Sequence, residues 1–260
     1  SDIKEVTKLL DECHAMKIEV LGPDVNESHA DFGVNKKSQI RFGLKAIKGF
    51  GEAAAEAVVK EREENGPYKS IFDFVQRVPM SLIKRSGLEC LALSGAFDAF
   101  SSQIRREQFF ALTPKGETFI DTLNRYGIQY AQAQQEAKYS LFGMDAVEVN
   151  TPNIPDAESW NNLERLNRER ELVGIYLSAH PLDDYKVILE NICNLHMEQI
   201  SDLNAYANQE VSLGGIVTNV RKGISKNGKP YGILTIEDYS GTGEVALFGE
   251  NFSQWNGYAE

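Results

Sequence analysis

The chain has 260 residues, of which 42% are hydrophobic and 25% are charged, a composition typical of globular domains. Its apolar runs are too short to cross a bilayer and it shows no signal-peptide pattern, so we expect a cytoplasmic protein without membrane contact. The three cysteines, Cys13, Cys90 and Cys193, are too widely spaced for a zinc motif or a disulfide framework. We expect no metal site and no cofactor in this chain.

The net charge of -11 is unevenly distributed. Residues 41–110 hold 11 Lys or Arg against 9 Asp or Glu, whereas residues 111–209 hold 7 against 15. A weakly basic region in an acidic chain indicates modest, salt-sensitive affinity for nucleic acid. The acidic region is typical of a solvated or protein-facing module.

The first predicted elements precede residue 43. Residues 1–18 repeat apolar side chains at helical spacing, and Gly22-Pro23 ends this helix. Alternating apolar residues from Phe32 to Phe42 then predict a short β-hairpin that turns at Asn35-Lys36.

The most informative stretch runs from Leu44 to Val59 and combines a short apolar helix, a Gly-x-Gly turn and an alanine-rich helix starting at about Glu52. Glycines in such a turn allow positive φ and let backbone N–H groups approach an anion, and the following helix dipole favours phosphate. This pattern is typical of a helix-hairpin-helix that binds a DNA backbone; the alternative is an ordinary two-helix turn. The candidate DNA contacts are Lys45, Lys48, Gly49, Phe50 and Gly51.

A second, degenerate copy of this pattern follows. Ser70 caps a predicted helix from Ile71 to Arg77, and another helix runs from about Ser81 to Leu93. A glycine turn at 94–97 and a helix from Ser102 then complete the predicted repeat. Arg105 and Arg106 are its candidate phosphate contacts, although adjacent arginines are also typical of a solvated face.

The middle of the chain is predicted to be mostly helical. A long polar helix covers residues 116–137, and residues 143–156 read as a linker. A helical stripe from Trp160 to Tyr176 closes at His180-Pro181, where His180 is interpreted as a cap.

From Val211 the apolar period changes to two, which predicts three antiparallel strands joined by a turn at 226–229 and followed by a short helix. This order is typical of the start of an OB-fold, whose sheet and first loop commonly bind single strands; the alternative is a plain β-meander. The predicted fold class is therefore α+β and multidomain, with a mostly helical tandem helix-hairpin-helix domain followed by the start of an all-β OB-fold. The candidate single-strand contacts are Arg221, Lys222, Lys226, Lys229 and Tyr231.

Six passages together resemble the C-terminal part of the bacterial replicative DNA polymerase III alpha subunits, in that family's order. They are PDVNES at 23–28, IRFGLKAIKGFGEAA at 40–54, GPYKSIFDF at 66–74, LALSGAFD at 91–98, SLFG at 140–143 and LVGIYLSAHPLDDY at 172–185.

The resemblance implies a non-catalytic segment of a DNA-directed DNA polymerase, since the family's catalytic carboxylates and their divalent metal, such as Mg²⁺, lie upstream. It implies the end of the fingers domain at 1–39, the tandem hairpin domain at 40–145, a linker with a helical segment at 146–205, and a truncated OB-fold at 206–260. The implied partners are the duplex DNA backbone, single-stranded template, the sliding clamp and other replicase subunits.

The resemblance also implies a sliding-clamp-binding peptide at Ser140, Leu141 and Phe142, with Lys138 at the family's glutamine position. Two other function classes stay open beside the replicase. One is a helix-hairpin-helix segment of a repair nuclease or DNA ligase, although the ligase Lys-x-Asp-Gly motif is absent. The other is a single-strand or tRNA-binding OB module.

Overall fold

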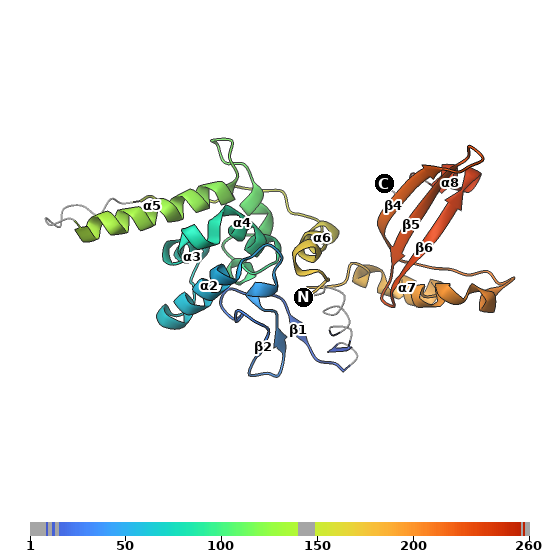
Figure 1. The fold of residues 1–260 in the computed structure, drawn as a ribbon, viewed down its shortest axis with the longest axis horizontal. Helices are drawn as coiled ribbons and strands as arrows, with labels where there is room; N and C mark the ends of the chain where they lie inside the picture. Colours follow the sequence, from blue (N-terminus) through green and yellow to red (C-terminus); the bar gives the residue numbers. More distant parts are fainter. Residues whose placement is uncertain (1–8, 10–11, 14–15, 140–148, 256, 258–260) are drawn as a thin grey trace. The chain divides into compact units, whose positions relative to one another are not determined.

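The computed structural model describes residues 9, 12, 13, 16–139, 149–255 and 257. The chain divides into two compact units, Ser1–Ala179 and His180–Glu260. The first is mostly helical with a small sheet, and the second contains a three-stranded sheet with short helices (Figure 1). This mixture of helices and sheets agrees with the predicted α+β class, whereas the predicted boundaries after residues 39, 145 and 205 stay predictions.

A small sheet opens the first unit, in the order β1-β3-β2. β2 (Gly33–Val34) and β3 (Ile40–Arg41) pair antiparallel, so the predicted hairpin is confirmed. The Asn35 side chain closes its turn by accepting hydrogen bonds from the backbone of Lys37 and Gln39. β1 (Val20–Leu21) pairs parallel to β3 and was not predicted, since two residues are too few to show a period.

The loop at 23–28 holds distant parts of the first unit together. Asn26 pairs with the backbone of Tyr68, donating to its carbonyl at 2.9 Å and accepting from its N–H at 2.7 Å. The Val25 N–H donates to the Ala96 carbonyl at 3.0 Å. Two of the other passages that carry the family resemblance, 66–74 and 91–98, are therefore each hydrogen-bonded to this loop.

The helices that follow surround one core. η1 (Leu44–Ala46) leads through a turn into α2 (Glu52–Asn65), followed by α3 (Ile71–Arg77) and α4 (Met80–Leu93). The Ser70 hydroxyl accepts the Asp73 N–H at 3.1 Å, which confirms the predicted cap of α3. The side chains that are almost fully buried in this core include Phe42, Leu44, Ile47, Ile71, Phe74, Leu88, Leu91, Phe109, Phe119, Ile120 and Leu123.

The predicted helix from Ser102 is wrong. After α4 the chain forms two short 3₁₀ helices, η2 (Asp98–Phe100) and η3 (Arg106–Phe110), and residues 101–103 lie in a turn. Phe100, Ile104 and Phe109 are all buried, so the chain bends repeatedly to turn them inward.

α5 (Phe119–Tyr139) and α6 (Asn162–Val173) complete the first unit. The N-terminal part of α5 packs on α3 and α4, whereas its C-terminal half is mostly exposed and projects from the other helices of this unit (Figure 1). α6 begins at the Asn161 cap and ends at Gly174, whose φ is +89°. It is therefore shorter than the predicted stripe from Trp160 to Tyr176.

A buried ion pair fastens α6 to the core. The Arg106 guanidinium donates to Glu169 on α6 at 2.9 Å and to Asp98 at 2.9 Å, and the side chains of Arg106 and Glu169 are only 7% and 1% exposed. The other Glu169 oxygen accepts the N–H groups of Leu177 and Ser178. The region predicted as a linker with a helical segment thus contributes a charged anchor to the helical unit.

The second unit begins with η4 (Asp183–Tyr185), α7 (Lys186–Ile192) and η5 (Met197–Tyr206). β4 (Ile216–Ile224), β5 (Pro230–Glu237) and β6 (Thr242–Phe248) then form an antiparallel meander, and α8 (Gly249–Trp255) follows. Three antiparallel strands and a short helix agree with the predicted order, although β4 starts five residues after Val211. The OB-fold itself stays a prediction.

We predict that Arg62→Met destabilises the helical unit by about 2–4 kcal/mol, because hydrogen bonds from charged groups are lost inside the protein. Arg62 is buried and donates to the carbonyls of Val25 and Ser28 at 2.9 and 2.7 Å. Urea unfolding followed by far-ultraviolet circular dichroism measures the change. Lys60→Met on the same helix is the control, since its exposed side chain predicts a change within about 0.5 kcal/mol. Equal effects of the two variants would contradict the prediction.

We also predict that Glu169→Gln lowers the free energy of unfolding by about 3 kcal/mol, because the buried Arg106 loses one of its two charged partners. The same urea titration applies. Glu164→Gln, on the same helix, removes only a half-exposed pair with Arg168 and should cost at most about 1 kcal/mol. A stability loss no greater than that of Glu164→Gln would show that the buried pair contributes little.

Candidate nucleic-acid interface

The turn between η1 and α2 uses its two glycines for different reasons. Gly49 has φ +83°, and a Cβ added there would lie 3.2 Å from the Cys90 sulfur, so both conformation and space favour glycine. Gly51 has φ −72° and open space around its missing Cβ, so a larger residue would fit the fold. The packing and the backbone conformation therefore do not require glycine at position 51.

The start of α2 presents its first backbone N–H groups to solvent. The first N–H groups of a helix have no partner within the helix, and the N-cap, Gly51, has no side chain that could accept them. Gly51, Glu52 and Ala53 are all exposed. These donors, together with the helix dipole, form an arrangement that favours an anion.

Phe50 supports the turn from inside and does not face solvent. It is 5% exposed, and its ring approaches Gly87 on α4 so closely that a Cβ there would lie 3.2 Å from it. The Cys90 thiol, whose pKa is raised by burial, donates to the Lys48 carbonyl at 3.4 Å. Phe50, which the sequence analysis names as a candidate DNA contact, thus lies inside the turn, and α4 supports the turn through Gly87 and Cys90.

The two lysines of the hairpin differ in their surroundings. Lys45 forms ion pairs with Glu52 at 2.8 Å and Asp31 at 3.2 Å, and hydrogen bonds to these two carboxylates raise the pKa of its ammonium. Lys48 is exposed, and no described carboxylate forms an ion pair with it. The sequence pattern could not distinguish the two lysines as DNA contacts, because Asp31, one of the two partners of Lys45, lies in a loop 14 residues away.

The backbone at Lys48 has a partner that the sequence did not indicate. Its N–H donates to the carbonyl of Leu172, at the end of α6, at 2.9 Å. A phosphate would therefore meet the side chain of Lys48 and the N–H groups at the start of α2, and not the Lys48 amide. No sequence motif could reveal this contact, because any residue at position 172 offers the same carbonyl.

The second predicted hairpin does not assemble a comparable site. Arg106 is buried between Asp98 and Glu169, so its guanidinium is already satisfied and a phosphate contact there is not supported. Arg105 is exposed but pairs with Glu107 at 3.0 Å and donates to the Ala157 carbonyl. Arg105 is exposed and Arg106 is buried because the 3₁₀ helix η3 begins between them. The sequence pattern did not predict this short helix.

The candidate clamp peptide begins where α5 ends. Lys138 lies in the last turn of α5. Ser140, Leu141 and Phe142 lie outside the described residues, so their predicted role stays a prediction.

The basic residues of the second unit lie on β4 and its turn. Lys226 and Lys229 are exposed in the turn between β4 and β5, which closes at Gly228 with φ +70°. Arg221 pairs with Glu244 across the sheet. Lys222 is also exposed, on the strand next to Arg221. The structure thus brings the cations to one strand and its turn.

Tyr231 has an aromatic neighbour that the sequence analysis missed. It lies opposite Phe248 in the register of β5 and β6, with ring centroids 5.8 Å apart, and Phe248 is 61% exposed. The ring of Tyr231 crosses Gly223, where a Cβ would lie 2.8 Å from it. The alternating side chains of β6 could have indicated Phe248 as a neighbour of Tyr231, since residues opposite each other on adjacent strands lie on the same face of the sheet.

The described residues contain neither a metal-binding cluster of three or more side chains nor a membrane-spanning helix. Within these ranges no group of three His, Cys, Asp or Glu side chains could hold a metal ion. Likewise, no helix in the described part of the chain is long and apolar enough to cross a membrane. The Asp183 carboxylate accepts hydrogen bonds from the His180 N–H and the Tyr239 hydroxyl at 2.8 Å each.

Comparison with known proteins identifies the hairpin region. A family model described as a helix-hairpin-helix motif matches residues 17–108. This range contains the small sheet, the η1–α2 turn and helices α2 to α4.

Similar proteins extend over almost the whole chain. The DNA polymerase III subunit alpha of Vibrio cholerae is 30% identical over 257 residues, which cover 97% of this chain and 21% of that protein. The Thermus aquaticus subunit is 33% identical over 96% of this chain and 19% of its own length, and the Chlamydia muridarum subunit is 32% identical over 100% and 20%. The chain therefore spans about a fifth of the length of these curated relatives. Over nearly its whole length, this chain is homologous to a segment of the DNA polymerase III alpha subunit, and it contains a helix-hairpin-helix motif.

Proposed function

We propose that this chain is a non-catalytic, DNA-binding and sliding-clamp-binding segment of a replicative DNA polymerase III alpha subunit. The observation that carries the proposal is the η1–α2 turn, in a chain homologous to polymerase subunits. There the exposed helix N–H groups lie beside Lys48, with which no described carboxylate forms an ion pair. Homology to these subunits over 96–100% of the chain favours a replicase over a repair nuclease, a ligase or a separate OB module.

The duplex DNA backbone is the proposed ligand of the η1–α2 turn. Gly51 leaves space for a phosphate oxygen to reach the first N–H groups of α2, and the Lys48 ammonium supplies charge. Because Glu52 and Asp31 neutralise Lys45, the turn offers little net positive charge. The expected affinity is therefore modest and falls with salt.

The sliding clamp is the proposed second partner. Ser140, Leu141 and Phe142 match the family's clamp-binding peptide and follow directly after α5. A clamp tether would compensate for weak DNA binding, since rebinding within a complex is governed by a high effective concentration.

Single-stranded template is the proposed ligand of the β4–β5–β6 sheet, as the start of an OB-fold. Tyr231 and Phe248 supply neighbouring aromatic rings on one face, and Lys226 and Lys229 supply positive charge at the adjoining turn. Stacking on aromatic rings combined with backbone attraction to lysines is the usual basis of sequence-tolerant single-strand binding.

The polymerase reaction itself, with its divalent metal, is assigned to other parts of the full-length subunit. We expect the segment to work with other replicase subunits in the cytoplasm.

We predict that Lys48→Ala weakens duplex binding roughly fivefold, about 1 kcal/mol, and lowers the salt slope by about one counterion, because one phosphate contact is lost. Lys45→Ala should change the affinity less, since two carboxylates already neutralise this lysine. Fluorescence anisotropy with a labelled duplex between 25 and about 150 mM salt measures both. Gly51→Leu should fold normally but block the phosphate and lose most of the binding.

Lys60→Ala is the control for these variants, because it removes an exposed lysine from the far part of α2. Unchanged affinity and salt slope in Lys48→Ala and Gly51→Leu, with binding present in the parent chain, would refute the hairpin as the DNA contact.

For the clamp, we predict saturable binding of a labelled peptide of residues 136–145 to the sliding clamp of the same replicase. Leu141→Ala with Phe142→Ala should abolish binding, because these two residues supply the apolar contact area. Lys138→Gln should strengthen binding by restoring the family's polar anchor. Absence of saturable binding by both the parent and the Lys138→Gln peptide would remove the clamp from the proposal.

A further inference from the structure

The helix α4 is interrupted at Lys84, whose backbone has a conformation that lysine rarely adopts. Its φ is +58° and its ψ is 171°, whereas helical residues precede and follow it. This conformation is populated almost only by glycine, because a Cβ comes too close to the neighbouring peptide groups. A lysine at this position therefore strains the backbone, and glycine would fit the fold better.

The core explains the bend in α4 but not the lysine that occupies it. On one side of the bend Ile83 is 2% exposed, and a Cβ added at Gly87 would lie 3.2 Å both from this isoleucine and from the Phe50 ring. These contacts involve the residues before and after Lys84. Lys84 itself is exposed, and none of the described Asp or Glu side chains forms an ion pair with it.

The bend lies beside the η1–α2 turn. The part of α4 that follows Lys84 runs along this turn, because the Cys90 thiol donates to the Lys48 carbonyl and Gly87, one helical turn earlier, lies against the Phe50 ring. Lys84 comes three residues before Gly87, at the start of this row of contacts. The packing of α4 on the turn thus brings Lys48 and Lys84 to one region of the helical unit, although they are distant in the sequence.

The basic residues of this region differ in whether a carboxylate neutralises them. Arg85, next to the bend, pairs with Asp121 at 2.7 Å and with Glu89 at 2.6 Å. Lys48 and Lys84 are exposed, and neither forms an ion pair with a carboxylate in the described ranges. Two uncompensated charges beside one turn are complementary to the DNA backbone, in which phosphates follow one another at short intervals.

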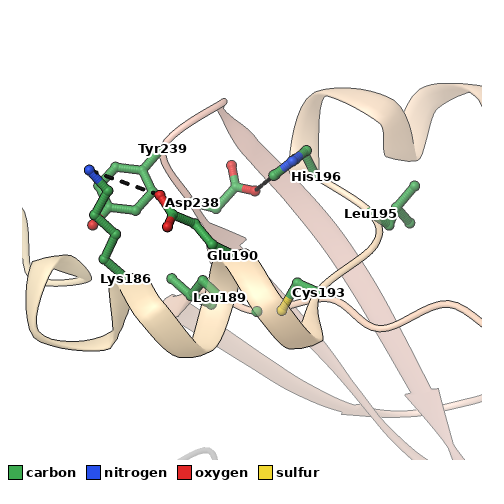
Figure 2. A pocket seen from close by; sticks show the side chains of 9 residues that line it. Lys186, Leu189, Glu190, Cys193, Leu195, His196, Asp238 and Tyr239 are labelled. Atoms are coloured by element: carbon green, nitrogen blue, oxygen red, sulfur yellow. Dashed lines mark ion pairs between the residues drawn. The ribbon is translucent and has the colours of Figure 1, made fainter.

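A pocket of about 240 Å³ in the second unit shows the opposite situation. Its ionisable side chains face one another, since Lys186 pairs with Glu190 at 4.0 Å and the His196 ring lies 3.7 Å from Asp238 (Figure 2). The charges that line this pocket are compensated within it, so they do not indicate a charged ligand as Lys84 does.

We propose that Lys84 is a second contact to the duplex DNA backbone and binds a phosphate close to the one held by the η1–α2 turn. This inference rests on the proposed function of that turn. It assigns to Lys84 the second basic contact that the sequence pattern assigned to Arg105 and Arg106. A positive charge thus occupies a position where the fold favours glycine, so DNA binding is gained at the expense of stability.

The test measures stability and duplex affinity on the same variants of the 260-residue chain. Lys84→Gly should raise the urea concentration at the midpoint of unfolding, because the relieved strain outweighs the added freedom of the unfolded glycine. By anisotropy with a labelled duplex, the same variant should bind about fivefold more weakly, with a salt slope lower by about one counterion. Combined with Lys48→Ala it should lower the slope by about two. Lys84→Arg keeps the charge and should keep the affinity within about twofold.

Ser38→Gly is the matched control for the backbone, since it removes a Cβ at another exposed position with positive φ, +61°, but no charge. Its duplex affinity should stay unchanged. If Lys48→Ala weakens binding and Lys84→Gly does not, this contact is refuted and the proposed function stands. Failure of both variants to change binding, or no duplex binding by the parent chain, would overturn both. A lower unfolding midpoint in Lys84→Gly would mean that the fold itself requires the lysine, which also contradicts the inference.

Discussion

A buried guanidinium joins α6 to the rest of the helical unit. Arg106 reaches Asp98, which follows the turn after α4, and Glu169 on α6, so a single side chain joins segments 63 residues apart. Breaking the buried pair with Glu169 would leave an uncompensated charge in a medium of low dielectric, whereas Asp98 is 45% exposed and solvent partly screens its pair. The charge that the sequence pattern assigned to phosphate is used to hold the domain together.

This anchor has consequences at the hairpin turn. Because Glu169 fixes α6, the carbonyl of Leu172 lies where it accepts the Lys48 N–H. On the other side, α4 supports the turn through Gly87 and Cys90. The geometry of the η1–α2 turn is therefore set by packing from two sides, and the exposed atoms themselves contribute little to it. A rigid support of this kind lowers the entropy lost when a ligand binds.

Local features were predictable where a pattern repeats or a cap has a specific side chain. The start of α2, the Ser70 cap and the three antiparallel strands follow from glycine spacing, a hydroxyl acceptor and alternation. The missed features depend on contacts between distant residues. Asp31 and Glu52 neutralise Lys45, and Arg106 is buried against Glu169. No repeating pattern of residues in the sequence marks either contact.

The length of α5 sets how far its C-terminal end lies from the helices on which its first turns pack. Its 21 residues make a rod of about 30 Å, and the residues matching the clamp peptide follow its end. A single residue inserted into the exposed half would rotate the C-terminal end of α5 by about 100° about the helix axis and advance it by about 1.5 Å. The length of α5 therefore sets the direction in which its C-terminal end faces as well as its distance from the other helices. Only insertions or deletions close to whole helical turns would keep that direction unchanged.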